Sequence, residues 1–160
     1  MRYVLLDRIT AVEPGRSARG LKAVTLTDEV LHDHFPDFPV YPGALLVEAA
    51  AQLAGFLVEA SAFPGQEPTH RAVLGQIDRA KFHRPARPGD CVELFAELEQ
   101  SLESAARVHV GADIAGEPSL RGSLTFLLVR LESERLRAQR RQLYDLWTRD
   151  LPRAEGGWKR

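Results

Sequence analysis

Hydrophobic and polar positions alternate along two segments near the start of the chain. Residues 2–13 and 18–27 have the two-residue period of half-buried strands, and the turn signal Pro14-Gly15 separates them. Four further strands are expected after residue 70, near 71–77, 90–100, 106–115 and 120–131. The pattern therefore predicts a largely antiparallel sheet whose first two strands are separated from the other four.

A long apolar helix is predicted between these two groups of strands. It is expected to start at the Pro-Gly pair 42–43, where proline suits the first helical turn, and to run to about residue 60. In residues 40–58, only Glu48 and Gln52 carry strongly polar side chains. Because a helix that is apolar nearly all round must be enclosed, and a curved sheet covers one side only, the other side needs a second copy of the chain or another layer.

The remaining segments predict shorter elements. Residues 27–31 are typical of one helical turn, and 32–42 hold three prolines, which exclude regular helix or strand. A short segment, 81–83, is expected to separate two of the later strands. Residues 132–149 return to helical composition, with one narrow apolar stripe among many charges. The members of that stripe are Leu136, Leu143 and Trp147.

Composition and charge limit the classes of function. The chain has 160 residues, which favours one domain with a real core. Its 21 basic and 22 acidic residues give a net charge of −1, so nothing in the balance indicates a nucleic-acid partner. Cys91 is the only cysteine, which excludes an intrachain disulfide and a cysteine metal site.

The apolar run also has the length of a membrane span. However, it opens with Pro42-Gly43 and carries Glu48 and Gln52, which are costly in a bilayer. The N-terminus shows no signal-peptide core. We therefore expect a helix buried in protein and a cytoplasmic location.

One histidine and one glutamate stand out as candidate chemistry. His34 lies in the proline-stiffened loop, and Glu48 follows fourteen residues later inside the apolar helix. An acid and a base in an apolar setting can move a proton on and off an apolar substrate. Two plainer interpretations stay open: His34 as a structural or surface histidine, and Glu48 as one half of a structural ion pair.

The sequence around these residues resembles the FabZ-type (3R)-hydroxyacyl-acyl-carrier-protein dehydratases of the hotdog fold. The first matching motif runs from His34-Phe35-Pro36 through Pro42-Gly43 to Glu48-Ala49-Ala50-Ala51-Gln52. A second covers residues 77–85 together with Pro88-Gly89-Asp90, and a weaker third covers 5–9. The motifs span residues 5 to about 130 in the family's order.

The resemblance implies an α+β hotdog fold, in which a curved antiparallel sheet wraps around a long central helix. Residues 1–131 would form the dehydratase domain, and 132–160 a C-terminal helical extension beyond the family's usual end. The implied activity is that of a hydro-lyase of lipid metabolism. It would convert (3R)-hydroxyacyl thioesters on acyl carrier protein to trans-2-enoyl thioesters, in fatty acid or fatty-acid-like biosynthesis. Glu48, where FabA-type relatives carry aspartate, points to dehydration without isomerisation.

The resemblance also assigns roles to residues. His34 would take the C2 proton, and Glu48 would protonate or orient the C3 hydroxyl. The backbone N–H of Gly43 would stabilise the thioester oxygen at the helix N-terminus. Gln52, one turn after Glu48, would orient that carboxylate, although a purely structural hydrogen bond is nearly as plausible. Three further residues are expected near the substrate: Val40, Tyr41 (where methionine is common) and Phe82, which as a core aromatic would look the same in sequence.

Partners follow from the same resemblance. The carrier protein is acidic, so the basic cluster Arg79, Lys81, Arg84 and Arg87 is a candidate docking patch, with a solvated basic face as the equal alternative. Arginines 135–141 are expected to form a charged helix surface, or else to help recruit the carrier. The family builds each site from two subunits, which implies a homodimer or a trimer of dimers. No cofactor and no metal are implied.

Two other functions remain open at this point. A hotdog thioesterase would need a carboxylate or an activated water, but not the pairing of a loop histidine with a helix glutamate. A non-catalytic hotdog subunit would pack beside an active partner and would not need both residues. Acyl chain length is not fixed by the sequence.

Overall fold

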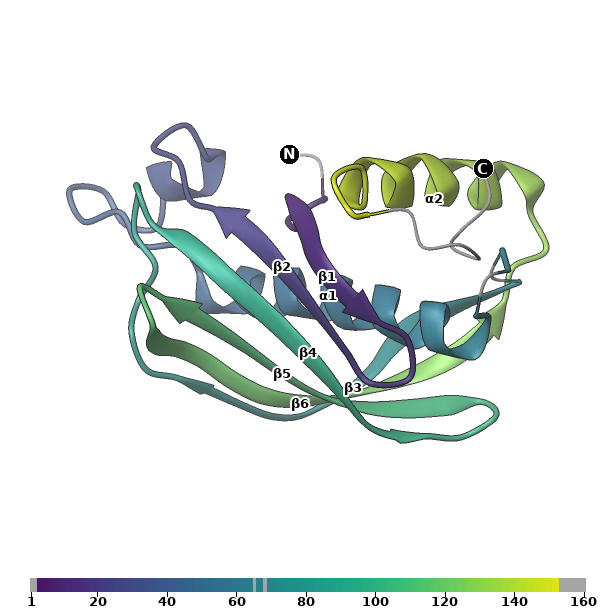
Figure 1. The fold of residues 1–160 in the computed structure, drawn as a ribbon. Helices are drawn as coiled ribbons and strands as arrows, with labels where there is room; N and C mark the ends of the chain where they lie inside the picture. Colours follow the sequence, from purple (N-terminus) through teal and green to yellow (C-terminus); the bar gives the residue numbers. More distant parts are fainter. Residues whose placement is uncertain (1–2, 65, 68, 153–160) are drawn as a thin grey trace.

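A six-stranded antiparallel sheet forms the main layer of the molecule (Figure 1). The computed structural model describes residues 3–64, 66–67 and 69–152. The strands lie in the order β1-β2-β4-β5-β6-β3. Their bounds are β1 Arg8–Glu13, β2 Ser17–Ala23, β3 His70–Phe82, β4 Cys91–Ser101, β5 Ala105–Ile114 and β6 Glu117–Arg130. The predicted strands are confirmed, and β3 lies at the edge opposite β1.

β3 is longer than the sequence pattern predicts. It pairs with β6 from His70 to Phe82, and register shifts fall between Leu74 and Gln76 and between Ile77 and Arg79. These bulges break the two-residue alternation that would have extended the prediction past residue 77. The expectation of a separate segment at 81–83 is therefore wrong, because residues 81 and 82 belong to the strand.

The first strand is shorter than predicted. β1 begins at Arg8, although strand character was expected from residue 2. The backbone N–H groups of Leu5 and Leu6 donate to the side-chain oxygen of Gln52 instead of to a neighbouring strand. Leu5 and Leu6 are therefore bound to the central helix, and contact with the sheet begins at Asp7, whose N–H donates to the Leu21 carbonyl of β2 at 3.0 Å. Residues 1–2 lie outside the described part of the chain.

The central helix, α1, runs from Gly43 to Ala62 across the inner face of the sheet. It contacts all six strands, and most of its side chains are buried. By length and composition α1 could cross a membrane, but 72% of its apolar window is buried inside the protein. This enclosure is what the sequence predicts for a helix that is apolar nearly all round.

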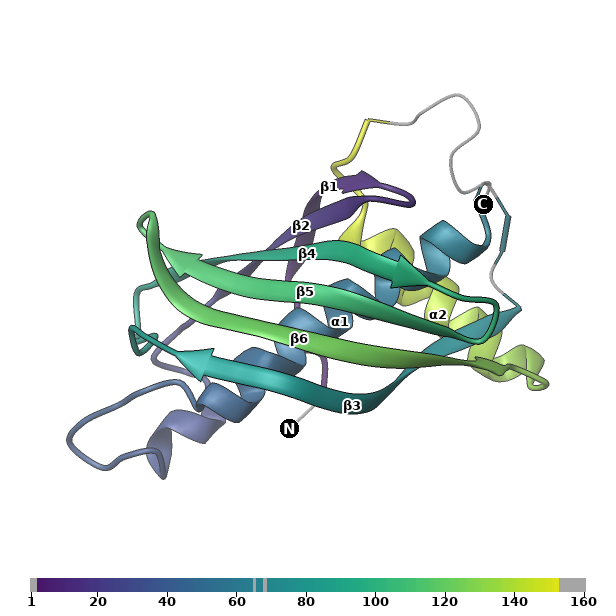
Figure 2. The ribbon, with the colours of Figure 1, turned by 90° about the horizontal axis from the view of Figure 1, so that it is seen from below.

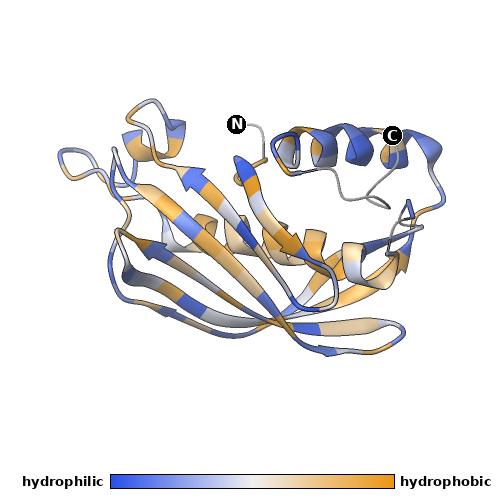
Figure 3. Ribbon diagram, in the orientation of Figure 1, coloured by the Kyte–Doolittle hydropathy of each residue, from blue (hydrophilic) through white to orange (hydrophobic). Residues whose placement is uncertain are grey.

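A second helix, α2, covers part of α1 on the side away from the sheet (Figure 2). It runs from Glu134 to Trp147, and a 3-10 turn, η1, spans Glu29–His32. Ser133 caps α2 by accepting the N–H of Leu136. The colouring in Figure 3 shows that α2 is mostly hydrophilic, in contrast to α1. α2 thus supplies another layer on α1.

The buried face of α2 differs from the predicted stripe. Of the three predicted members, Trp147 is buried and Leu143 packs against the core, whereas Leu136 is 47% exposed. Tyr144, which was not predicted, is buried. The helix over 132–149 is confirmed with slightly narrower bounds, and residues 153–160 of the expected extension lie outside the described residues. The division of the chain at residue 131 stays a prediction.

Candidate active site

The loop before α1 holds His34 through two bonds to one residue. The N–H of Val40 donates to the His34 carbonyl at 2.9 Å, and the Val40 carbonyl lies 2.7 Å from His34 Nδ1. The imidazole also stacks on Phe35, with ring centroids 4.1 Å apart. The prolines stiffen this loop, and the two bonds close it around the half-buried histidine.

These contacts decide which ring nitrogen of His34 can act as a base. A carbonyl oxygen only accepts hydrogen bonds, so Nδ1 must carry the proton in its bond to Val40. In the neutral imidazole the lone pair is then on Nε2. Val40, predicted near the substrate, therefore has a definite part in the geometry: it fixes the tautomer and the orientation of the histidine.

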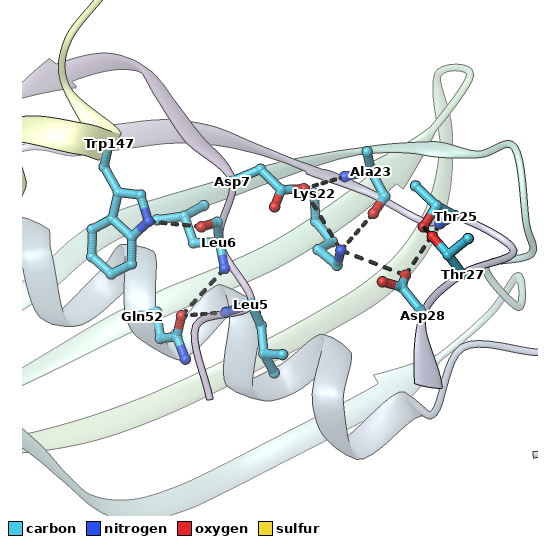
Figure 4. A network of polar contacts seen from close by, with 10 residues as sticks. All are labelled: Leu5, Leu6, Asp7, Lys22, Ala23, Thr25, Thr27, Asp28, Gln52 and Trp147. Atoms are coloured by element: carbon cyan, nitrogen blue, oxygen red, sulfur yellow. Dashed lines mark hydrogen bonds and ion pairs between the residues drawn. The ribbon is translucent and has the colours of Figure 1, made fainter. Parts of the chain in front are cut away.

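Tyr41 anchors the end of this loop in the core. Its N–H donates to the Ala86 carbonyl at 2.8 Å, and its ring is 3% exposed. The ammonium of Lys22 lies 5.5 Å from the ring centroid and forms ion pairs with Asp7 and Asp28 (Figure 4). Burial raises the pKa of the Tyr41 phenol, and Asp28 and Asp7 raise it further. Tyr41 therefore stays neutral, and its buried side chain fixes the end of the loop to the core.

At the start of α1, Gly43 lies against the ring of Phe82. A Cβ atom at position 43 would lie 2.8 Å from Phe82 Cε1, which is closer than side chains pack. The Phe82 side chain remains 52% exposed. The N–H of Gly43 belongs to the first turn of the helix, where amides have no partner within the helix and the dipole is positive. The two residues thus lie together at a backbone donor.

Glu48 and Gln52 lie one turn apart on α1 and are joined directly. Gln52 Nε2 donates to Glu48 Oε1 at 3.0 Å, while Gln52 Oε1 accepts the N–H groups of Leu5 and Leu6 at 3.0 and 3.2 Å. Figure 4 shows the Gln52 side-chain oxygen joined to the backbone nitrogens of both Leu5 and Leu6. With its oxygen occupied by two donors, the amide can only present its NH₂ to the carboxylate. This geometry supports the expected orienting role of Gln52.

Glu48 faces an open pocket of 830 Å³ between α1, β3 and α2. Aliphatic side chains from all three elements contribute to its walls, with polar groups among them. The apolar members include Ala51, Leu74, Leu136, Leu143 and Leu146. A carboxylate at the wall of a partly apolar pocket is suited to a substrate that has one polar and one aliphatic part.

His34 does not line this pocket, and within the described residues no hydrogen bond or ion pair joins it to Glu48. A single chain thus presents two half-sites: the His34 loop with Gly43 and Phe82, and the Glu48–Gln52 pair above its pocket.

The predicted basic cluster is only partly available for docking. Arg84 forms ion pairs with Glu117 and Asp90, and Arg87 lies over the Phe38 ring at 4.7 Å. Arg79 and Lys81 are exposed on β3. The sequence also suggested that Arg140 is part of a charged surface, and this is wrong: its guanidinium points inward and binds Glu59 through two nitrogens.

Glu59 is a buried carboxylate that the sequence analysis missed. It is 0% exposed and accepts hydrogen bonds from Arg140, from the Tyr144 hydroxyl at 2.7 Å and from the Ala72 N–H at 2.7 Å. Burial raises the pKa of Glu59, and these three donors oppose the rise. The sequence feature that could have indicated this buried carboxylate is the position of Glu59, three turns after Glu48 on the same side of the helix.

Comparison with known proteins identifies the family. A family described as FabA-like domain matches residues 1–117. The 3-hydroxyacyl-[acyl-carrier-protein] dehydratase FabZ of Clostridium acetobutylicum is 34% identical over 128 residues, covering 79% of this chain and 87% of the relative. FabZ of Natranaerobius thermophilus is 37% identical over 134 residues, covering 80% and 89%.

This chain belongs to the FabZ family. The resemblance seen in the sequence motifs is thereby confirmed. The family match covers residues 1–117, so α2 lies outside it.

Solved structures show the same hotdog architecture. AziG from S. sahachiroi superposes with a TM-score of 0.62 at 16% identity, covering 79% of this chain and 92% of that one. A hypothetical thioesterase from Streptococcus pneumoniae, solved with coenzyme A, gives 0.61 at 12% identity, covering 79% and 88%. These similarities confirm the predicted fold, a curved sheet around a long helix, and at such identities they concern the fold alone.

Proposed function

We propose that this FabZ family member dehydrates (3R)-hydroxyacyl thioesters on acyl carrier protein to trans-2-enoyl thioesters, in fatty acid or fatty-acid-like biosynthesis. The observation that carries the mechanism is the 2.7 Å bond between His34 Nδ1 and the Val40 carbonyl, which leaves Nε2 as the free base. Family membership supports the substrate class.

His34 Nε2 removes the proton from C2 of the substrate. The electron pair of that C–H bond becomes the second bond between C2 and C3 as the bond from C3 to oxygen breaks. Charge that develops on the thioester oxygen is stabilised by the N–H of Gly43 and by the helix dipole. Phe82, against Gly43, closes one side of the space for the thioester.

Glu48 supplies the acid. Hydroxide is a poor leaving group, so the departing oxygen takes a proton from the Glu48 carboxyl and leaves as water. Proton exchange with solvent then returns one proton from His34 to Glu48. Gln52 holds the carboxyl in place through its 3.0 Å bond. The aliphatic part of the substrate occupies the pocket that Glu48 faces.

Each complete site is proposed to form between two copies of the chain. Two observations support this: a single chain separates His34 from the Glu48 pocket, and β3 is an edge strand with one side unpaired by any described residue. Exposed apolar residues on β3 would be covered by a partner strand. They are Val73, Ile77 and Phe82. A dimer, or a trimer of such dimers, satisfies this requirement.

The carrier protein is proposed to approach along Arg79 and Lys81, which are exposed on β3 and would meet its acidic surface. Arg84 and Arg87 contribute less, because their charges already have partners. A cytoplasmic location is part of this proposal, and the burial of most of the apolar window of α1 supports it only in that this helix needs no bilayer to cover it.

The test is turnover of a 3-hydroxyacyl thioester on carrier protein, followed by the ultraviolet absorbance of the 2-enoyl product. His34→Ala and Glu48→Gln are each expected to lower kcat by about 10²–10⁴, as for loss of a positioned acid or base. His109→Ala and Glu99→Gln are matched controls, because this exposed pair on β5 and β4 lies outside the site. Wild-type activity in the controls is expected.

Folded wild type that produces no enoyl product at any chain length would overturn the proposal. Release of free carrier thiol without an enoyl product would identify a thioesterase. If neither enoyl product nor free carrier thiol forms, the result would indicate a subunit that needs an active partner.

A further inference from the structure

The last residue of α2 forms a buried hydrogen bond that leads back to the active site. Trp147 Nε1 donates to the Leu6 carbonyl at 2.7 Å, and the indole is 3% exposed (Figure 4). Its ring also stacks on that of Tyr144, with centroids 5.8 Å apart. A donor that is buried in this way is costly to leave unpaired, so the bond fixes the distance between α2 and the Leu5-Leu6 segment.

The same segment holds Gln52 on its other side. The N–H groups of Leu5 and Leu6 converge on Gln52 Oε1, and Gln52 Nε2 donates to Glu48 Oε1. Neither residue belongs to a strand, since β1 begins at Arg8. Gln52 and Trp147 therefore bind the Leu5 N–H, the Leu6 N–H and the Leu6 carbonyl, and the sheet holds the chain from the next N–H on, since that of Asp7 donates to the Leu21 carbonyl of β2 at 3.0 Å.

We propose that Trp147 is a positioning residue for Glu48. It holds the Leu5-Leu6 backbone against Gln52, whose amide is then fixed with its NH₂ toward the carboxyl group. Without the indole N–H, the Leu6 carbonyl loses its partner while Asp7 stays bonded to β2, so the Leu5-Leu6 backbone can shift against α1, and Gln52 gains freedom to rotate or to bond elsewhere. The inference rests on the proposed function, and it assigns to α2 a part in catalysis although α2 touches no reacting atom.

α2 has a second attachment that supplies a matched control. The Tyr144 hydroxyl donates to Glu59 Oε2 at 2.7 Å, one turn before Trp147 and equally buried. This bond also joins α2 to α1, but it ends at Glu59 and not at Glu48. Trp147→Phe and Tyr144→Phe each remove one buried donor from the same helix and keep an aromatic ring.

The experiment compares these two variants in the full chain. Trp147→Phe is expected to lower kcat about tenfold with little change in KM, as for a misplaced catalytic group. Tyr144→Phe is expected to lower kcat much less than Trp147→Phe, even if the melting temperatures of the two variants fall equally. Both side chains line the pocket that Glu48 faces, so an effect of the pocket wall would appear in both variants. Trp147→His, which retains a ring N–H, is expected to recover part of the loss.

A double-mutant cycle tests the route of the effect. In the Gln52→Ala background, Trp147→Phe is expected to cause no further loss of kcat, because both changes act on Glu48 through the same amide. An equal tenfold loss in that background would overturn the proposal, as would wild-type kcat in Trp147→Phe or equal losses in Trp147→Phe and Tyr144→Phe.

A readout that needs no turnover separates this inference from the proposed function. The side-chain NH₂ signals of Gln52, assigned by their loss in Gln52→Ala, are expected to shift in Trp147→Phe and to stay unchanged in Tyr144→Phe. If wild type is inactive, the proposed function fails, and this NMR comparison still tests the positioning role. Unchanged Gln52 signals in Trp147→Phe would overturn it.

Discussion

The ring of Phe82 covers Gly43 so closely that a methyl group at position 43 would lie 2.8 Å from Phe82 Cε1. Gly43→Ala is therefore expected to displace the ring into the space for the thioester. Because Phe82 is half exposed it can swing aside, so the melting temperature should change little while kcat/KM falls about tenfold. Steady-state kinetics and thermal unfolding measure the two effects.

The cause is tested in a Phe82→Ala background. With the ring removed, Gly43→Ala is expected to lower kcat/KM little beyond the loss that Phe82→Ala itself causes. A loss that stays tenfold would show that the methyl group obstructs the substrate directly and that the ring has no part in it.

Mixing two inactive variants tests whether sites are shared. If His34 of one chain meets Glu48 of another, a mixed dimer of His34→Ala and Glu48→Gln chains contains one intact site and one doubly defective site. Random pairing of equal amounts then restores about a quarter of wild-type activity. Co-expression with two affinity tags provides the sample, and either variant alone is the control. No recovery in isolated mixed dimers would place both residues of each site in one chain.

The pocket beside Glu48 predicts an effect on chain length. Leu146 of α2 lines this pocket and is 49% exposed, so Leu146→Trp can fill the space without disturbing the core. We expect kcat/KM to fall for long acyl chains and to stay near wild type for the shortest. Leu102→Trp, at an exposed position outside the pocket, is the control. Equal losses at all lengths would argue against an acyl chain in this pocket.

The pair of Glu59 and Arg140 predicts a pattern in stability. The guanidinium of Arg140 is almost buried, and Glu59→Met removes the carboxylate that pairs with it. This loss should lower the free energy of unfolding by about 3–5 kcal/mol. The double variant Glu59→Met/Arg140→Met is expected to recover much of this loss, because no unpaired charge remains. Urea unfolding measures all three proteins. A double variant that is less stable than Glu59→Met would contradict this explanation.

Charge reversal on β3 tests the carrier surface. Arg79→Glu and Lys81→Glu are expected to raise KM for the carrier-bound substrate, because they would repel its acidic surface. KM for a pantetheine thioester without the carrier should not change. Arg19→Glu, an exposed arginine on β2, makes the same change in net charge and serves as control. An equal rise in KM with Arg19→Glu would indicate a general charge effect.

Local patterns in the sequence were sufficient for much of the fold and for the two reactive residues. Alternation and apolar runs predicted six strands and the helix that became Gly43–Ala62, because those periods follow directly from backbone geometry. The prolines and the glycine around His34 likewise restrict the backbone residue by residue. The motif that links His34 to Glu48 is specific enough to indicate the family by its residues alone.

Only the tertiary structure decided how these residues are supported. The Glu59–Arg140 pair joins positions 81 residues apart, and the Trp147–Leu6 bond joins positions 141 apart. The residues next to Arg140 in the sequence predict a surface charge, because the partner that makes its burial favourable lies on another helix. In the same way, bulges in β3 and the lead-in to β1 depend on neighbours that are distant in the chain. The sequence by itself determined which elements form and which groups could react, whereas packing determined which polar groups are buried together.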